Sequence, residues 1–334
     1  MNDPVVDLAL TLINIESISG HELPMAEFLE SYLKPRGWEV TRQSVSPGRD
    51  NVLATRPGRQ PRLLFNSHID TVPPFFPARL EGDWLYGRGA CDTKSLIAAQ
   101  LLAAQELVEA GRDDMGLLYV VGEEVDHCGM IKANELNLKP EFLIVGEPTE
   151  SKLVRRQKGL VKVRLIQEGI AAHSGYPHTG RSALDPMLDV LADLRKEVWP
   201  ADVTLGETTM NIGILKAGRA ANIVPDRAYA EIMIRVVTHF REILDRVEEI
   251  VDQRVKVELI AANDPHQLNT FDDYETVVVA FNTDIPYFRF DGKAFLWGAG
   301  SILNAHTSGE KIRVGDLRDA VAVYRQLAER CLSG

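Results

Sequence analysis

The sequence has few cysteines, no long apolar run and no excess of positive charge. Its 334 residues include three cysteines, an odd number without zinc-knuckle spacing, so we expect no disulfide framework and a reducing compartment. No apolar run approaches the roughly 20 residues that a membrane-spanning helix needs. The net charge of −11 argues against a nucleic-acid partner and against an anionic membrane.

Two further features are missing. The first residues, MNDPVVDLALTLINIES, lack a basic segment and carry apolar residues at helical spacing, so we expect a helix over 3–15, no signal peptide and a cytoplasmic protein. No GxGxxG or P-loop motif follows any predicted strand, which argues against a nucleotide-binding enzyme. The 45% hydrophobic and 25% charged fractions are ordinary for a globular protein, and the length allows one large domain or two.

The first half of the chain alternates strands and helices. Apolar runs at 63–66, 116–121 and 142–145 predict buried strands, and an Ala/Leu-rich helix is expected over 94–110. This alternation predicts a mostly parallel sheet with helices on both faces, an α/β fold. Further helices are expected at 22–36 and 129–136, and further strands at 38–44 and 51–55.

From about residue 153 the pattern changes to strand, helix, two strands, helix and strand. The order β-α-β-β-α-β, with apolar and polar residues alternating along the strands, predicts a ferredoxin-like sandwich. We therefore expect an inserted second domain at 153–264 and a first domain made of 1–152 and 265–334. In the returning segment we expect a helix at 273–283, a strand at 294–297 and a closing helix at 315–332.

Polar groups follow the predicted strands at the edge where ligands collect in parallel sheets. His68 and Asp70 lie two residues apart after the first strand, so both face one side of an extended chain. This suits a metal-ligating histidine whose second ring nitrogen donates to a carboxylate. Such a pair occurs by chance in many chains, so it is weak evidence alone. The stronger evidence is that three separate apolar strands each end in an acidic residue or a histidine. The other strand ends and loops supply Asp92, Glu123, Glu124, Glu147 and His306.

Two imidazoles with three carboxylates form a ligand set suited to zinc, cobalt or manganese rather than calcium or magnesium. Five ligands exceed what one catalytic ion uses, and they fit two ions about 3.5–4 Å apart that share a bridging carboxylate. The neighbours Glu123 and Glu124 point opposite ways in an extended segment. One is therefore expected to be a ligand, and the other a general base that takes a proton from water and passes it to the leaving amine.

Seven motifs in this chain resemble the M20 family of metallopeptidases and deacylases. That family includes acetylornithine deacetylase, succinyl-diaminopimelate desuccinylase, aminoacylase and carboxypeptidase G types. The motifs occur in family order and span residues 66–310. They are SHIDTVP, YGRGACDTKS, GEEVD, VGEPT, AAHSGYPHTGRSAL, NIVPD and GAGSILNAHTSGE.

The resemblance implies a role for each site residue. In the metal centre, it implies that His68, Asp92 and Glu147 hold one ion and that Asp92, Glu124 and His306 hold the other. It also implies that Asp70 orients His68 and that Glu123 is the general base. The inserted domain 153–264 would be the family's dimerisation lid, making the protein a homodimer. His173 would then stabilise the oxyanion in the partner's active site. Asn222, Arg235 and the backbone of Gly298 would contact substrate.

Some of these assignments have alternatives, and the chain departs from the family in two places. Outside its motif His173 would be an ordinary surface histidine, and Arg235 suits a simple ion pair as well as carboxylate binding. Residues 298–301 read GAGS where the family usually has GPGD, which bears on substrate specificity and not on the metal site. The chain is also short for the family, mostly after residue 264.

On this resemblance we expect a hydrolase with two divalent ions, zinc first and cobalt or manganese as alternatives. The expected reaction removes an acyl group, acetyl in first place, from an amino acid such as ornithine, which suggests arginine biosynthesis. The alternatives within the family are a dipeptidase, an aminoacylase or a desuccinylase. A non-catalytic binding protein would have lost a ligand or the base, whereas every candidate position is filled here.

Overall fold

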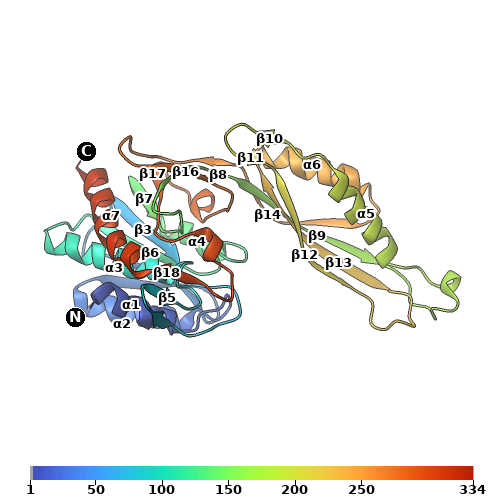
Figure 1. The fold of residues 1–334 in the computed structure, drawn as a ribbon, viewed down its shortest axis with the longest axis horizontal. Coiled ribbons are helices and arrows are strands. Elements are labelled where there is room, and N and C mark those ends of the chain that lie inside the picture. The colour runs from blue at the N-terminus through green and yellow to red at the C-terminus, as the bar shows by residue number, and fades with distance from the viewer. Residues whose placement is uncertain (1–2, 334) are drawn as a thin grey trace. The chain divides into compact units, whose positions relative to one another are not determined.

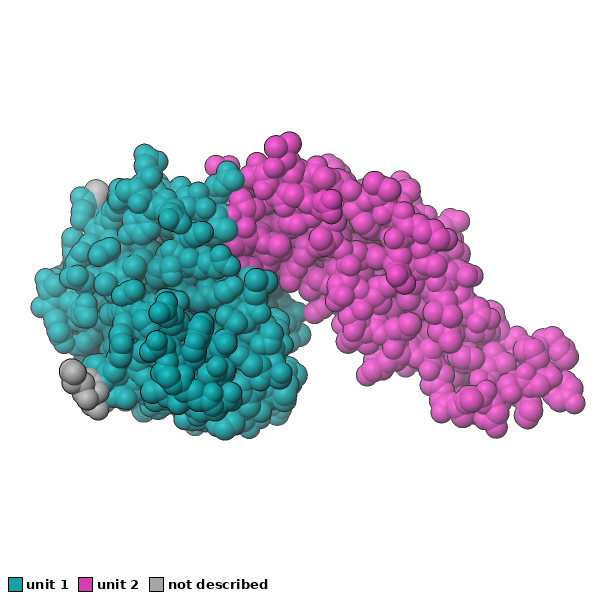
Figure 2. Space-filling model, in the orientation of Figure 1, with its two compact units in different colours: residues 1–155, 268–277, 283–334 teal, residues 156–267, 278–282 magenta. Residues whose placement is uncertain are grey.

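The computed structural model describes residues 3–333 and divides into two compact units (Figure 2). Unit 1 comprises Met1–Arg155, Leu268–Val277 and Thr283–Gly334, and unit 2 comprises Arg156–Gln267 and Val278–Asn282. Within 3–333, no helix combines the length and the apolar character that crossing a membrane requires.

Unit 1 is built on a six-stranded sheet in the order β1-β2-β6-β3-β7-β17. The pairs β3–β6, β3–β7 and β7–β17 are parallel, and the pairs β1–β2 and β2–β6 are antiparallel. All residues of β3 and β6 are buried, as expected for strands covered on both faces. This confirms the predicted α/β fold with a mainly parallel sheet. The strands are β1 (Glu39–Ser46), β2 (Arg49–Thr55), β3 (Leu63–His68), β6 (Met115–Val120), β7 (Phe142–Val145) and β17 (Lys293–Leu296).

Helices α1 (Pro4–Ile13), α3 (Lys94–Glu109) and α7 (Val314–Leu332) pack against one another, and α3 and α7 also contact β3 (Figure 1). Most of α3 is buried, which explains its Ala/Leu-rich composition on every face. The helices α2 (Leu23–Leu33) and α4 (Cys128–Ala133) contact β1 and β2 instead.

Unit 2 contains an antiparallel sheet in the order β12-β13-β9-β14 and the helices α5 (Leu184–Lys196) and α6 (Phe240–Val251). Its strands are β9 (Gly159–Glu168), β12 (Thr209–Ala217), β13 (Arg227–Val236) and β14 (Lys256–Asn263). In β13 every second residue is buried, because one face of the sheet packs on the helices. The predicted β-α-β-β-α-β sandwich is confirmed, with β12 and β14 as its outer strands.

The helix predicted at 273–283 is wrong. This segment contains strand β16 (Thr276–Val279), a run of four β-branched residues, which favour extended structure. The sequence also did not reveal a small sheet of β4 (Arg79–Glu81), β5 (Trp84–Tyr86) and β18 (Lys311–Arg313). The remaining short strands are β8 (Leu153–Gln157), β10 (Ala201–Asp202), β11 (Gly206–Glu207) and β15 (His266–Gln267).

Candidate metal centre

The centre forms where three neighbouring strands of unit 1 end at one edge of the sheet. In the register of β3 with β6 and β7, His68 pairs with Val120 and Asn66 pairs with Val145. The strands therefore end side by side. Residues just beyond β6 and β7 supply Glu123, Glu124 and Glu147, while His68 is the last residue of β3.

Asp92 reaches this edge from the loop that precedes α3. The loop turns at Gly87 and Gly89, with φ of +149° and +87°. A Cβ on Gly89 would lie 2.7 Å from the Lys94 side chain, so glycine is required there on both counts. Lys94 is buried and donates from Nζ to the Ile15 carbonyl at 2.6 Å. Burial lowers the pKa of Lys94 to about 7.

The two carboxylate oxygens of Asp92 face different imidazoles. Asp92 Oδ1 lies 3.0 Å from His68 Nε2, and Asp92 Oδ2 lies 3.3 Å from His306 Nε2. Glu147 Oε1 lies 3.8 Å from His68 Nε2, and Glu124 Oε2 lies 3.0 Å from His306 Nε2. The structure therefore brings all five proposed ligands together, although His306 is 182 residues from Glu124 in sequence.

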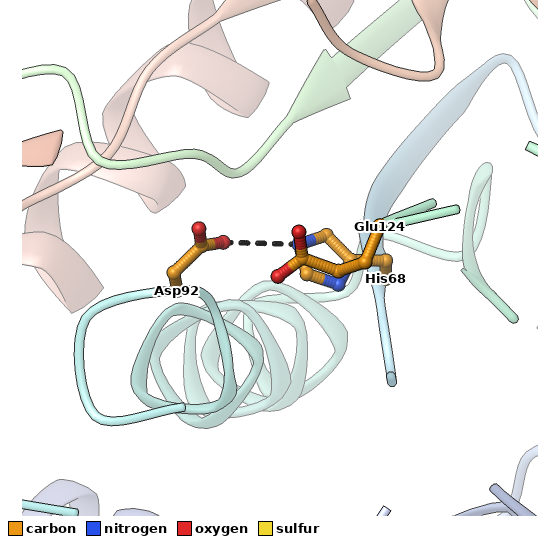
Figure 3. A group of neighbouring side chains, drawn as sticks. All are labelled: His68, Asp92 and Glu124. Atoms are coloured by element: carbon orange, nitrogen blue, oxygen red, sulfur yellow. Dashed lines mark hydrogen bonds and ion pairs between the residues drawn. The ribbon is translucent and has the colours of Figure 1, made fainter. Parts of the chain in front are cut away.

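Figure 3 shows three of these side chains pointing toward one another from β3, the loop before α3 and the segment after β6. One donor atom from each of His68, Asp92 and Glu124 lies within 4.8 Å of the others. This spacing suits ligands of a shared site, because metal–ligand bonds to nitrogen and carboxylate oxygen are about 2.0–2.2 Å long.

The charges around the centre also fit divalent cations. Although burial works against it, hydrogen bonds with His306 and His68 hold the pKa of Asp92 well below its usual value. Hydrogen bonds with Asp92 and Glu124 raise the pKa of His306 to about 10. Burial raises the pKa of Glu147 well above its ordinary value. Three ionised carboxylates thus create a negative potential that two imidazoles offset only in part and only when protonated. Divalent cations would displace those protons.

Asp70 makes two kinds of contact. Its backbone carbonyl accepts a hydrogen bond from His68 Nδ1 at 2.9 Å, while its carboxylate lies 3.6 Å from that nitrogen. The carboxylate also accepts hydrogen bonds from Ser19 Oγ and from the backbone N–H groups of Glu123 and Glu124, at 2.6, 3.1 and 3.3 Å. Asp70 therefore fixes the His68 ring mainly through its main chain, and its side chain anchors the segment after β6.

Glu123 lies in a buried group of ionisable side chains that the sequence did not reveal. Burial raises the pKa of Glu123 to about 8. His127 Nδ1 lies 3.8 Å from Glu123 Oε1 and 2.9 Å from Asp284 Oδ1, and the His127 ring stacks on Tyr287. The only sequence signal was that His127 follows Glu123 by four residues, and nothing local linked either residue to Asp284.

The predicted substrate contacts are divided between the units. Gly298 lies in unit 1, where a Cβ would come within 2.3 Å of the Glu147 carbonyl, so only glycine fits beside that ligand. His173, Asn222 and Arg235 lie in unit 2. There His173 is exposed and adjacent to Asn222, whose carbonyl accepts the Ser174 N–H at 3.0 Å.

Comparison with known proteins identifies the family. A family model described as a peptidase dimerisation domain matches residues 155–258. A peptidase M20 domain-containing protein of Schizosaccharomyces pombe is 40% identical, over 97% of this chain and 84% of its own length. The chain belongs to the M20 peptidase family. A second relative, from Aspergillus flavus and named a probable carboxypeptidase, is 36% identical over 98% of this chain and 88% of its own length.

Solved structures share the fold of this M20 chain at low sequence identity. The M20 family metallo-carboxypeptidase of Sulfolobus solfataricus has a TM-score of 0.80 at 17% identity, over 99% of both chains. A Bacillus subtilis protein described as a dinuclear metal-binding M20 peptidase has a TM-score of 0.67 at 14% identity, over 98% of both chains. The chain is thus a hydrolase of the M20 metallopeptidase family, which acts on peptide and amide bonds.

Proposed function

We propose that this M20 chain binds two divalent metal ions and hydrolyses the amide bond of a short peptide or an N-acyl amino acid. One ion would be held by His68, Asp92 and Glu147, and the other by Asp92, Glu124 and His306. The observation that carries the proposal is Asp92, whose two carboxylate oxygens each lie near a different imidazole, Oδ1 near His68 and Oδ2 near His306. This is the arrangement that a bridging carboxylate needs. The mixed nitrogen and oxygen donors favour zinc, cobalt or manganese.

When bound, such ions polarise the scissile carbonyl and make water more acidic. The remaining chemistry belongs to the chain. Glu123 lies beside the ligands without contacting His306, which Glu124 contacts. We assign Glu123 as the general base that takes a proton from the attacking water and delivers it to the leaving amine. Its raised pKa suits both steps, because a base with a pKa near the working pH can also act as an acid.

The substrate proposal differs from the acetylornithine that the sequence alone suggested. The Aspergillus flavus relative is named a probable carboxypeptidase, and the Sulfolobus solfataricus protein a metallo-carboxypeptidase. These names favour a peptide over acetylornithine as substrate. A dipeptide and an N-acyl amino acid offer the same amide carbonyl and C-terminal carboxylate, so one site can accept both. Arg235 and Asn222 are proposed to contact the substrate, and His173 its oxyanion.

A substrate panel tests this proposal. Zinc-loaded protein is incubated with dipeptides and with N-acetyl derivatives of ornithine, citrulline and glutamate, and release of the free amino acid is measured. We expect turnover of at least one dipeptide, with a higher kcat/KM than for N-acetylornithine, and loss of activity after chelation that zinc or cobalt restores. Absence of turnover on every dipeptide and N-acyl amino acid would refute the proposal.

We also propose that the chain is a homodimer that associates through unit 2. The support is the match of residues 155–258 to a peptidase dimerisation domain and the outer position of β12 in its sheet. Most residues of β12 are exposed, including Ile214 and Leu215. An exposed outer strand readily pairs with another strand. A second copy of unit 2 presents the same exposed strand, β12.

A further inference from the structure

Glu310 is a buried carboxylate that binds the loop carrying Asp92. Its Oε1 atom accepts hydrogen bonds from the backbone N–H groups of Gly89, Cys91 and Asp92, each at 3.0 Å. Its Oε2 atom accepts a hydrogen bond from Arg88 Nη1 at 2.6 Å. The Glu310 and Arg88 side chains are 1% and 2% exposed. One side chain thus accepts four hydrogen bonds from residues 88–92.

The main chain strengthens this connection. Gly87 N–H donates to the Glu310 carbonyl at 3.2 Å, so residue 310 contacts both ends of the loop. Arg88 is itself fixed, because its Nε donates to the Pro74 carbonyl at 3.2 Å. Hydrogen bonds to a charged acceptor are stronger than those to a neutral one, so this buried group holds the loop firmly.

Glu310 also lies close in sequence to another ligand. His306 precedes it by four residues, has a φ of +60° and is half exposed. His68, in contrast, is the last residue of a fully buried strand. The strand therefore fixes His68, whereas the spacing between Asp92 and His306 depends on two loops, and Glu310 joins them.

We propose that Glu310 is a positioning residue for the second metal ion, the one assigned to Asp92, Glu124 and His306. The inference rests on the two-ion site proposed above. In this role Glu310 holds Asp92 through the backbone N–H and keeps His306 at the distance that a shared ion requires. The first ion depends less on Glu310, because His68 and Glu147 stand at the ends of buried strands.

Zinc titration of the metal-free protein by isothermal titration calorimetry tests this inference, with Glu310→Gln as the variant. Glutamine keeps the size of the side chain, but it removes the charge and turns an N–H₂ group or a neutral oxygen toward Arg88. We expect the wild type to bind two zinc ions. In Glu310→Gln we expect the first ion at near wild-type affinity and the second about 10- to 100-fold weaker, as for other groups that orient ligands.

Glu22→Gln is the matched control. Glu22 is also fully buried and pairs with an arginine, Arg49, at 2.7 Å, but it contacts neither the Asp92 loop nor the His306 segment. We expect this variant to melt at a lower temperature and still to bind two zinc ions normally. Glu310→Asp is a second variant in case glutamine prevents folding. It keeps the charge but is one methylene shorter, so it too should weaken the second ion selectively.

The outcomes separate the two proposals. If the wild type binds two ions and Glu310→Gln or Glu310→Asp binds both with unchanged affinity, the role of Glu310 is refuted and the two-ion site stands. Equal weakening of the second ion in Glu22→Gln would also refute it, because any buried ion pair would then suffice. If the wild type binds fewer than two ions, the two-ion site itself fails.

Discussion

At the residue scale, Glu123 and Glu124 show how two adjacent carboxylates can take different roles. Glu124 contacts His306 at 3.0 Å, whereas the nearest imidazole to Glu123 is that of His127, at 3.8 Å. The backbone N–H groups of both residues are held by the Asp70 carboxylate. The two residues lie in a turn after Gly122 and not in the extended segment that the sequence predicted. Their carboxylates contact different imidazoles, so one can bind metal while the other remains available for proton transfer.

Replacing Glu123 by glutamine tests this division. Glu123→Gln keeps the shape of the side chain but cannot accept a proton, so we expect kcat to fall by about 10²- to 10⁴-fold while metal content stays unchanged. Steady-state kinetics and elemental analysis measure the two quantities. Glu135→Gln, the same change at an exposed glutamate of unit 1, should leave both as in the wild type. Near-full activity of Glu123→Gln would exclude Glu123 as the base.

At the scale of elements, much of the centre could be read from the sequence because it follows strand ends. His68, Glu123, Glu124 and Glu147 each stand at or just beyond a buried apolar run, and that signal is local. The features that could not be predicted from the sequence depend on contacts between distant segments. Asp284 beside His127 and Glu310 beside Asp92 are examples, and so is the sheet of β4, β5 and β18.

The prediction of a helix at 273–283 was wrong because the local signal was too short. The four residues of β16 are too few to be distinguished from helix by periodicity alone. Their β-branched side chains were the available signal for a strand. The ferredoxin-like unit was predictable because its strands are long and alternate in polarity, and its helices are amphipathic.

The apolar run of β3 supports the strand end that carries His68. Phe65 is fully buried and packs edge-to-face on Tyr324 of α7, with ring centroids 5.6 Å apart. We expect Phe65→Ala to lower the free energy of unfolding by about 3–5 kcal/mol, measured by urea denaturation of the metal-free protein. Leu80→Ala on the exposed strand β4 should change it by less than about 0.5 kcal/mol. Similar losses in both variants would contradict the central position of β3.

At the scale of the whole molecule, the two units carry different parts of the proposed chemistry. The ligands and Glu123 lie in unit 1, and His173, Asn222 and Arg235 lie in unit 2. Unit 2 also carries the match to a dimerisation domain. If His173 serves the partner's active site, as the family resemblance implies, activity would depend on association.

Light scattering after size exclusion tests this association. We expect a mass about twice the 37.1 kDa of one chain. Adjacent strand residues face opposite sides, so replacing both Ile214 and Leu215 by lysine places a charge on each face of β12. We expect this variant to be monomeric, because lysines discourage strand pairing, and to lose most activity. Leu80→Lys in unit 1 should remain dimeric, and a monomeric wild type would contradict the proposal.

The central claim is that remote segments converge so that Asp92 is shared between two divalent ions. An anomalous difference map from crystals of the zinc-loaded protein tests it most directly. The account predicts two zinc peaks about 3.5–4 Å apart, with one oxygen of Asp92 bound to each ion, His68 and Glu147 on one side, and Glu124 and His306 on the other. A single peak, or two peaks without Asp92 between them, would contradict it.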